Sequence, residues 1–257
     1  MSNLLCHHIS ATIVTLNEER NIRRCLTSLQ EIADEIIVLD SGSQDRTEEI
    51  CNSFPKVRFI HQEWLGFSGQ KQRAVDLAAH DIILSLDADE SLSEELRHEI
   101  LEKKKQGFSP FEAFELKRKT NYCGKWIHFC GWYPDPQLRL FHRQHGHWLQ
   151  VPIHEHVICE KNVHVNRLSG DIHHYSYYSV SDHLVKIEKY AELGAQGLLK
   201  KNAKFLGLKS YTNALSRFIK IYFLKLGFLD GFSGLQIAGL AAYSVHQKYK
   251  KAKLHGR

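Results

Sequence analysis

The sequence predicts an α/β fold in which helices cover both faces of a parallel sheet. Three short apolar runs, at residues 10–16, 35–39 and 81–86, are rich in aliphatic and β-branched residues, and polar or acidic residues follow each of them. Short strands that alternate with helices are typical of parallel sheets, and such sheets bind ligands beyond the carboxyl ends of their strands. We therefore expect the three polar turns to meet at one edge of the sheet.

The first run is followed by a polar turn and then by a helix. Asn17, Glu18 and Glu19 close the run, and apolar residues recur at helical spacing in segment 20–30. That spacing predicts a helix with one buried face. Strand, turn and helix form the unit that the following segments repeat.

The second run has the composition of a buried strand and ends directly at Asp40. A carboxylate at a strand end can contact a bound ligand. It can also form an Asx turn with Ser41 and Gly42, and the two roles are compatible. Asp40 is therefore a candidate site residue with a local structural alternative.

The third run ends at an acidic triplet, Asp87, Asp89 and Glu90. Two carboxylates one residue apart at a strand end can reach one hard divalent cation, and a cation in an open α/β crevice indicates a phosphorylated ligand. The alternative is that the acids begin the next helix, where they complement its dipole and where Ser91 or Ser93 caps it.

The composition is that of a globular chain. The 257 residues are 43% hydrophobic and 25% charged, which suits one large core, or one domain with an appendage. The net charge of +5 is modest, and basic residues gather in the C-terminal segment. We expect that segment to attract anionic lipid or phosphorylated glycans, with solvated lysines as the alternative, and we expect no nucleic-acid partner.

The N-terminus and the cysteines indicate the compartment. The first residues lack the basic region and long apolar run of a secretory signal, so we expect a cytoplasmic protein. The six cysteines are irregularly spaced, and we expect reduced thiols instead of a disulfide framework.

Composition shifts divide the rest of the chain. A helix is expected over residues 91–106, with lysines at its C-terminal end and a break at Gly107. Residues 111–178 are aromatic and β-rich, and a helical tail follows. We expect a catalytic domain over 1–178, with a donor half at 1–110 and an acceptor half at 111–178, and a tail over 179–257.

Three motifs resemble the signatures of family 2 glycosyltransferases with the GT-A fold: residues 15–19, 40–45 and 86–90. Segments 66–71 and 132–135 are similar to the branch that contains bacterial lipopolysaccharide core β-1,4-glucosyltransferases. The resemblance covers residues 9 to 178 well and the tail loosely. It implies a Rossmann-like mixed sheet flanked by helices, with a C-terminal helical appendage, and the transfer of a sugar from a nucleotide diphosphate.

The resemblance also implies a donor site. Lys71 matches a basic position of the family, which often has Arg followed by Asn where this chain has Lys71 and Gln72. The positions that match nucleotide-sugar contacts of the family are Thr15, Asn17, Glu18, Asp40, Ser43, Asp45, Lys71, Asp87 and Ala88.

A divalent cation, Mg²⁺ or Mn²⁺, is implied as the cofactor. Asp89 is the expected direct ligand, and Asp87 is expected to hold the ribose, the metal or a metal-bound water. His174 is the expected additional ligand, because enzymes of this fold often recruit a late histidine. A buried, hydrogen-bonded histidine is the alternative for His174, and His154 could take the metal role instead.

Inversion at the sugar carbon needs a general base that accepts the proton of the acceptor hydroxyl. Glu155 is the last residue of segment 151–155, which resembles the acceptor motif of the lipopolysaccharide branch, and this makes it the expected base. Asp135 is the alternative, and its competing role is a salt bridge to Arg139. Trp148 is one of several aromatic residues that either stack on sugar rings or pack in the core.

The resemblance implies an inverting hexosyltransferase that moves glucose from UDP-glucose to a lipid-linked saccharide such as the lipopolysaccharide core. Another cell-envelope or capsular polysaccharide is an alternative acceptor, and a catalytically silent saccharide-binding protein is an alternative function. A nucleotidyltransferase is disfavoured, because residues 17–20 lack the Gly-rich basic loop that those enzymes carry after the first strand.

The sequence pattern of the tail predicts contact with a membrane surface. An apolar helical stripe with basic neighbours precedes a second apolar run of 12 residues at 234–245, and neither has the roughly 20 apolar residues that cross a bilayer. We expect an interfacial helix pair on the cytoplasmic face of the inner membrane. Packing on the catalytic domain or a homodimer is the alternative. The stripe consists of Leu215, Phe218, Ile219, Tyr222, Phe223 and Leu226, beside Arg217, Lys220 and Lys225.

Overall fold

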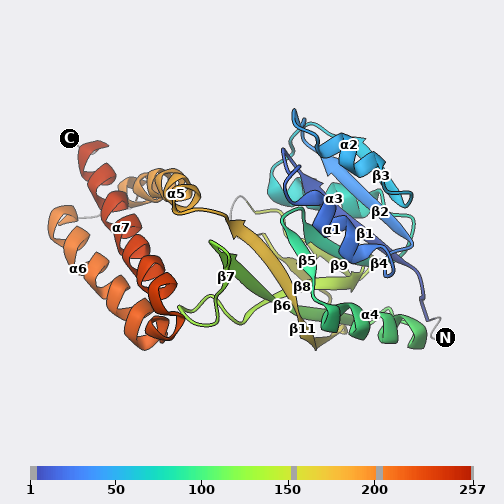
Figure 1. The fold of residues 1–257 in the computed structure, drawn as a ribbon. Coiled ribbons are helices and arrows are strands. Elements are labelled where there is room, and N and C mark those ends of the chain that lie inside the picture. Colours follow the sequence, from blue (N-terminus) through green and yellow to red (C-terminus); the bar gives the residue numbers. More distant parts are fainter. Residues whose placement is uncertain (1–4, 152–154, 201–204, 256–257) are drawn as a thin grey trace. The chain divides into compact units, whose positions relative to one another are not determined.

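The computed structural model describes residues 5–151, 155–200 and 205–255 and has a mixed α/β architecture (Figure 1). The chain forms two compact units. The first consists of residues 1–118 and 135–174, and the second of residues 119–134 and 175–257. The division into donor half, acceptor half and tail stays a prediction.

The first unit contains most of the strands and four helices among its described residues. Its strands are β1 (Ile9–Thr15), β2 (Glu35–Asp40), β3 (Val57–His61), β4 (Ile82–Asp87), β5 (Glu90–Leu92), β8 (Asp135–His142), β9 (Gly146–Trp148) and β10 (Val157–Cys159), with most of β6 (Glu112–Tyr122) and β11 (His164–Tyr177). Its helices are α1 (Ile22–Leu29), α2 (Thr47–Asn52), α3 (Phe67–Asp76) and α4 (Glu94–Gln106).

The central sheet is mixed. Across the described residues its order is β3-β2-β1-β4-β8-β6-β11-β5, and β7 (Lys125–Trp126) pairs with β6. Strands β1 to β4 are parallel where they pair, whereas β8 runs antiparallel to β4. The three apolar runs correspond to β1, β2 and β4, so the predicted fold class is confirmed.

Strand β2 shows why both faces of the sheet are covered. Ile36 and Val38 are buried in a cluster with residues of α1, α2 and α4, whereas Ile37 and Leu39 are buried in another cluster with residues of α3. Successive side chains of a strand point to opposite faces, so an unbroken apolar run requires cover on both sides. The helices occupy the faces, and the carboxyl edge of the strands is left for polar residues.

Helix α4 begins later than the acidic triplet. The hydroxyl of Ser93 accepts a hydrogen bond from the Leu96 backbone N–H at 3.1 Å, so Ser93 is the cap. Gly107, with φ of +86°, ends the helix as predicted. Because Glu90 begins strand β5, the alternative that the triplet opens this helix is wrong.

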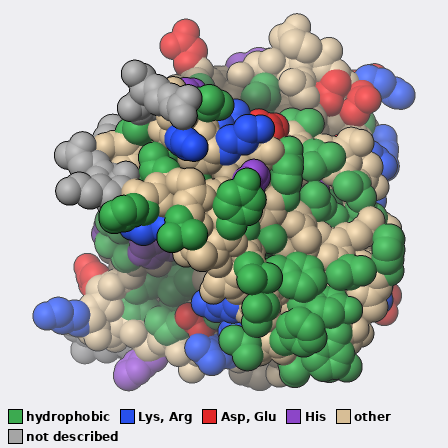
Figure 2. All heavy atoms as spheres, turned by 90° about the vertical axis from the view of Figure 1, so that its left-hand side faces the viewer, with side chains coloured by type: hydrophobic (Ala, Val, Ile, Leu, Met, Phe, Trp, Pro, Cys, Tyr) green, Lys and Arg blue, Asp and Glu red, His purple; other side chains and the backbone are tan. Residues whose placement is uncertain are grey.

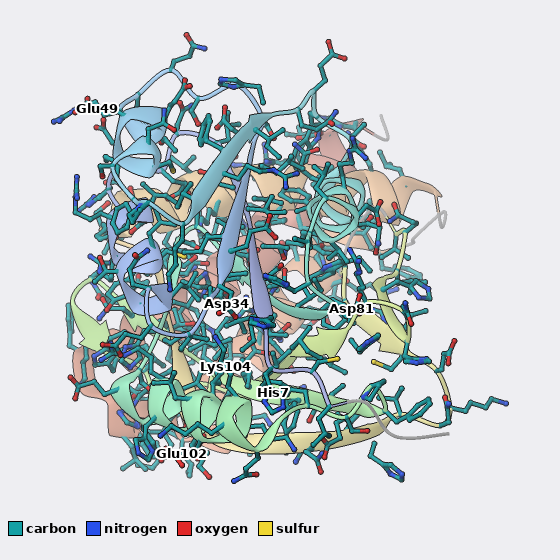
Figure 3. All side chains as sticks on the ribbon, turned by 90° about the vertical axis from the view of Figure 1, so that its right-hand side faces the viewer. His7, Asp34, Glu49, Asp81, Glu102 and Lys104 are labelled. Atoms are coloured by element: carbon teal, nitrogen blue, oxygen red, sulfur yellow. The ribbon has the colours of Figure 1, made fainter. Side chains whose placement is uncertain are left out.

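The amino-terminal edge of the sheet is tied to α4 (Figure 3). Lys104 donates hydrogen bonds to the Asp34 carboxylate and to the backbone oxygen of Ile32, both at 2.7 Å. The ring nitrogen Nδ1 of His7 lies 2.9 Å from the backbone oxygen of Lys104. Partial burial raises the pKa of Asp34, but Lys104 and the Ile9 N–H outweigh it and the pKa is lowered overall.

Gly170 of β11 lies against the first turn of α4, where there is no space for a side chain. A Cβ at Gly170 would lie 2.3 Å from the Leu96 backbone nitrogen. We expect Gly170→Ala to destabilise the protein by about 1–3 kcal/mol, because backbone would have to move. Gly197→Ala in α5 (Val180–Lys200) is the matched control, because its Cβ would meet nothing within 4 Å and alanine favours a helix. Thermal unfolding tests the pair, and equal shifts in Tm would contradict the packing.

The second unit is mainly helical. It contains α5, α6 (Leu206–Ile219), a π-helical turn η1 (Lys220–Leu224), a 3-10 turn η2 (Gly227–Asp230) and α7 (Gly231–His255). Its core joins Tyr122, Ile127 and Cys130 to Ile221 and Ile237. Among the helices that the structure describes, none combines the length and the apolar character needed to cross a membrane.

A buried histidine makes the stability of the second unit depend on pH. Burial and the nearby Lys186 charge lower the pKa of His183 to about 4, and its ring lies 3.2 Å from the Tyr122 hydroxyl. Below pH 6.5 the unfolded chain protonates this histidine, whereas the folded chain does so only near pH 4. Stability therefore falls as pH decreases from 6.5 to 4, by an amount on the order of 3 kcal/mol. We expect His183→Phe to flatten this dependence in urea unfolding at pH 7 and 4.5, and parallel dependences would contradict it.

Candidate functional site

The three polar turns meet at one edge of the sheet. Thr15 pairs with Asp40 in the β1–β2 register, and Val14 pairs with Asp87 in the β1–β4 register. Asp89 follows two residues after the end of β4. The predicted convergence of these turns at the carboxyl ends of parallel strands is therefore present.

The first two turns are hydrogen-bonded to each other. The Asn17 backbone N–H donates to the Ser43 hydroxyl at 2.8 Å, and the Asn17 side-chain oxygen accepts from the Gln44 N–H at 2.8 Å. The Glu19 N–H donates to the Asp45 carboxylate at 3.0 Å. Asn17, Ser43 and Asp45 thus fix the shape of this edge, and their contacts with a donor stay predictions.

Asp40 is fully buried and forms the Asx turn that the sequence left open. Its carboxylate accepts hydrogen bonds from the backbone N–H groups of Gly42 and Ser43, both at 2.9 Å, and from the Ser43 hydroxyl. His61 Nδ1 lies 3.4 Å from the same carboxylate. The turn holds Asp40 at the strand end, and its contact with a nucleotide base stays a prediction.

Thr15 and Glu18 differ in what they leave for a ligand. The Thr15 hydroxyl is buried and has no hydrogen-bond partner in the described part of the chain. Glu18 is held by local contacts: its N–H donates to Thr47 Oγ1 at 2.8 Å, and its carboxylate accepts from Asn21 at 2.7 Å. A buried hydroxyl without a partner is unfavourable unless a ligand or water completes it, so Thr15 fits a binding site.

A cluster of ion pairs lies next to these turns. Lys71 Nζ is 2.7 Å from Asp87 Oδ1, and Arg139 Nη2 is 3.1 Å from Asp87 Oδ2. The same Arg139 nitrogen is 3.2 Å from Glu90 Oε1, and Arg118 Nη1 is 3.4 Å from that oxygen. Helix α3 and strands β4, β5, β6 and β8 each contribute a residue, so the cluster depends on the folded sheet.

Burial makes the cluster electrostatically strong. Burial alone would raise the pKa of Asp87, but Lys71 and Arg139 outweigh it and hold the pKa well below its usual range. Arg139 is 2% exposed, and Glu90 and Asp87 raise its pKa against the effect of burial. Asp87 and Arg139 therefore remain charged at neutral pH.

Trp148 lies beneath both cations. Lys71 Nζ is 4.7 Å and Arg139 Cζ is 5.6 Å from the centre of its ring. Arg139 Nε and Nη1 are buried and have no hydrogen-bond partner among the described residues. Trp148 is 2% exposed and belongs to a core cluster, so packing in the core is the observed one of its two predicted roles. Arg139 keeps hydrogen-bond donors that an anion could use.

Asp89 and His174 lie together, and their role as metal ligands stays a prediction. His174 Nε2 is 3.3 Å from Asp89 Oδ2, and the pairing of β11 with β5 places His174 opposite Glu90. A carboxylate oxygen beside an imidazole nitrogen fits Mn²⁺ and tolerates Mg²⁺. Asp87 faces Lys71 and Arg139 instead, so its role as a metal ligand stays a prediction. Ala88 is buried in the core, and its contact with the nucleotide sugar also stays a prediction. His154 lies outside the described residues.

The two candidate bases differ in how firmly they are held. Glu155 Oε1 has a contact of 3.6 Å with Lys71 Nζ. Asp135 Oδ2 accepts from Arg118 Nε and Nη2 at 2.9 and 2.7 Å, and Oδ1 accepts from Gln137 at 2.9 Å. The expected salt bridge of Asp135 to Arg139 is wrong. Four residues of a strand span about 13 Å, whereas the β6–β8 pairing places Arg118 directly opposite Asp135.

Sequence reasoning did not identify Arg118 as a site residue, and it did not place Arg139 at the carboxyl edge of the sheet. It also missed the supporting role of Gln70. The side chain of Gln70 is fully buried and donates to Ser41 Oγ at 2.9 Å, which links α3 to the turn after β2. An arginine inside the apolar run Leu138–Phe141 was a usable signal, because a buried charge needs partners.

Another group of possible metal ligands lies elsewhere in the first unit. Ligand atoms of Cys6, Asp81 and His142 all lie within 4.8 Å of one another. Arg143 Nε is 3.0 Å from the Asp81 carboxylate and already balances its charge. We therefore assign no cation to this group.

Comparison with known proteins agrees with the motifs. A family model described as "Glycosyl transferase family 2" matches residues 10–110. An uncharacterized glycosyltransferase of Rickettsia typhi is 30% identical over 253 residues, which cover 95% of this chain and 86% of that protein. The chain belongs to glycosyl transferase family 2, as predicted, and is therefore a transferase of sugars.

Another curated relative and two solved structures differ in sequence identity to this chain and in the share of the chain that they cover. The lipopolysaccharide core biosynthesis glycosyltransferase LpsC of Rhizobium meliloti is 28% identical, over 94% of this chain and 93% of that protein. Among solved structures, TarS of S. aureus in complex with UDP has a TM-score of 0.37 at 21% identity, over 43% of this chain and 36% of that one. Glucosyl-3-phosphoglycerate synthase of Mycobacterium tuberculosis, in complex with Mn²⁺, UDP and glucosyl-3-phosphoglycerate, has a TM-score of 0.35 at 23% identity, over 44% of each chain.

Proposed function

We propose that this glycosyltransferase moves glucose from UDP-glucose to a lipid-linked saccharide, with inversion at the sugar carbon. The observation that carries the proposal is the cluster that the buried cations Lys71 and Arg139 form with the partly buried Asp87 at the carboxyl edge of the sheet. It lies in the part of an α/β sheet where nucleotide ligands bind, and it contains cations and hydrogen-bond donors suited to a diphosphate.

The nucleotide sugar is held by groups that have unused hydrogen-bond donors. Arg139 Nε and Nη1 and the Thr15 hydroxyl are buried without partners in the described part of the chain. An anion that reached Arg139 would satisfy its two free nitrogen donors and share the positive charge that now serves Asp87 and Glu90. The aligned turns after β1 and β2 then contact the base and ribose.

Asp89 and His174 would hold Mg²⁺ or Mn²⁺, since their ligand atoms lie 3.3 Å apart beside the same edge. A bound divalent cation supplies Lewis-acid stabilisation of the diphosphate as it leaves. Lys71 adds a positive charge from the protein itself.

Glu155 is proposed as the general base that accepts the proton of the acceptor hydroxyl. Its contact with Lys71 is 3.6 Å long, whereas hydrogen bonds from Arg118 and Gln137 occupy both oxygens of Asp135. A carboxylate whose charged partner lies at 3.6 Å can turn toward the acceptor more easily than one fixed by three short hydrogen bonds. This contrast favours Glu155 over Asp135.

The acceptor proposal rests on a relative. LpsC is named for lipopolysaccharide core biosynthesis and matches 94% of this chain. We propose a core saccharide on its lipid carrier as acceptor, at the cytoplasmic face of the inner membrane. Other envelope or capsular polysaccharides are alternative acceptors, a silent saccharide-binding protein is the alternative function, and a homodimer stays a prediction.

The test is an incubation of purified protein with a panel of UDP sugars, extracted core lipid and Mg²⁺ or Mn²⁺. We expect glucose to be transferred from UDP-glucose and the transfer to stop when a chelator is added. Binding of UDP-glucose without transfer to any of the acceptors would favour the silent binding protein.

A further inference from the structure

The turn between α6 and α7 and the adjoining ends of these helices expose large apolar side chains. Leu224 is 73% exposed and Phe232 is 72% exposed. We call these exposed apolar side chains the apolar tip. Figure 2 shows hydrophobic side chains gathered in the lower right of the view. The exposed members of the tip are Ile219, Phe223, Leu224, Leu226, Phe228, Leu229, Phe232 and Leu235.

The backbone that carries the tip has a defined conformation, because buried polar contacts and close packing fix it. The Asp230 carboxylate is 2% exposed and accepts from the backbone N–H groups of His128 at 3.1 Å and Phe129 at 2.8 Å. A Cβ at Gly234 would lie 1.8 Å from the Gly227 backbone oxygen, so the start of α7 packs directly on η2. The apolar side chains therefore point outward from a defined backbone.

The exposed charges on the segment that carries the tip are basic. Asp230 is the sole acidic residue of residues 206–257, and its carboxylate is buried. Arg217, Lys220 and Lys225 are exposed beside the tip. Exposed apolar area with cations and without exposed acids complements an anionic lipid surface, whereas contact of this face with a second copy would bring like charges together.

We propose that the apolar tip inserts into the interfacial region of an anionic lipid bilayer, with Arg217, Lys220 and Lys225 at the level of the headgroups. The stripe predicted from the sequence included Phe218 and Tyr222, but both pack against the core of the second unit. The inserting surface is accordingly the turn and its flanks, and it differs from the pair of interfacial helices predicted from the sequence.

The first test is sedimentation of the full chain with vesicles of phosphatidylcholine, with and without phosphatidylglycerol. We expect binding only to the anionic vesicles and a loss of about tenfold or more with the double variant Leu224→Asp/Phe232→Asp. The matched control is Val185→Asp/Leu208→Asp, whose parent residues are 71% and 69% exposed outside the tip. Equal losses in the two variants, or binding that ignores phosphatidylglycerol, would overturn the proposal.

A second measurement reports insertion directly. Brominated lipids should quench the fluorescence of Leu224→Trp relative to the same variant in unbrominated vesicles, and Leu208→Trp should show no such quenching. A wild-type dimer that Leu224→Asp/Phe232→Asp dissociates, without vesicle binding by the wild type, would assign the tip to self-association instead. The vesicles contain neither donor nor saccharide, so these outcomes are independent of the proposed transfer reaction.

Discussion

Asp89→Ala and Glu155→Gln are each expected to abolish sugar transfer, but through different steps. Loss of the Asp89 carboxylate removes the group that lies 3.3 Å from His174 and would hold the cation, so UDP binding should lose its dependence on Mn²⁺. Glu155→Gln removes a proton acceptor, and we expect transfer to fall by about 10²–10⁴-fold while UDP binding is kept. Transfer assays combined with calorimetric UDP titrations separate the two effects.

Asp135→Asn is the matched control for the base. Its carboxylate binds Arg118, so we expect a lower Tm and a smaller loss of activity than in Glu155→Gln. Full activity of Glu155→Gln together with an inactive, folded Asp135→Asn would transfer the role of base to Asp135.

Arg139→Leu is expected to cause the largest loss of stability in the first unit. The substitution leaves the buried Glu90 carboxylate and the partly buried Asp87 carboxylate beside a missing charge, and breaking a buried pair in this way costs about 3–5 kcal/mol. Urea unfolding followed by circular dichroism measures the change in the free energy of unfolding.

The matched control is Arg46→Leu, because Arg46 pairs with Glu49 on the exposed surface. We expect no measurable change there, since solvent and salt screen exposed pairs. Similar losses for the buried and the exposed arginine would contradict the account of the cluster.

The sequence was sufficient for the strand ends and their convergence. Apolar runs specify buried strands, and parallel strands bring their carboxyl ends to one edge, so Asp40 and Asp87 could be placed together without coordinates. The three-residue strand β5 could not be predicted, because so short a segment shows no period.

The ion pairs of the site depend on contacts between distant strands. Arg139 reaches Asp87 because β8 adds antiparallel to β4, and the local pattern of either segment does not encode that pairing. The turn residues show a related limit. Sequence marked Asn17 and Ser43 as polar residues at the edge, but only geometry shows that they bond to each other.

The central claim is that the carboxyl edge of the sheet binds a nucleotide diphosphate beside a cation. Its most direct test is a crystal structure of the protein grown with UDP and Mn²⁺. We predict the diphosphate within hydrogen-bond distance of Lys71 or Arg139, and Mn²⁺ bound by Asp89 and His174. Ordered UDP at any place away from these four residues would contradict the claim.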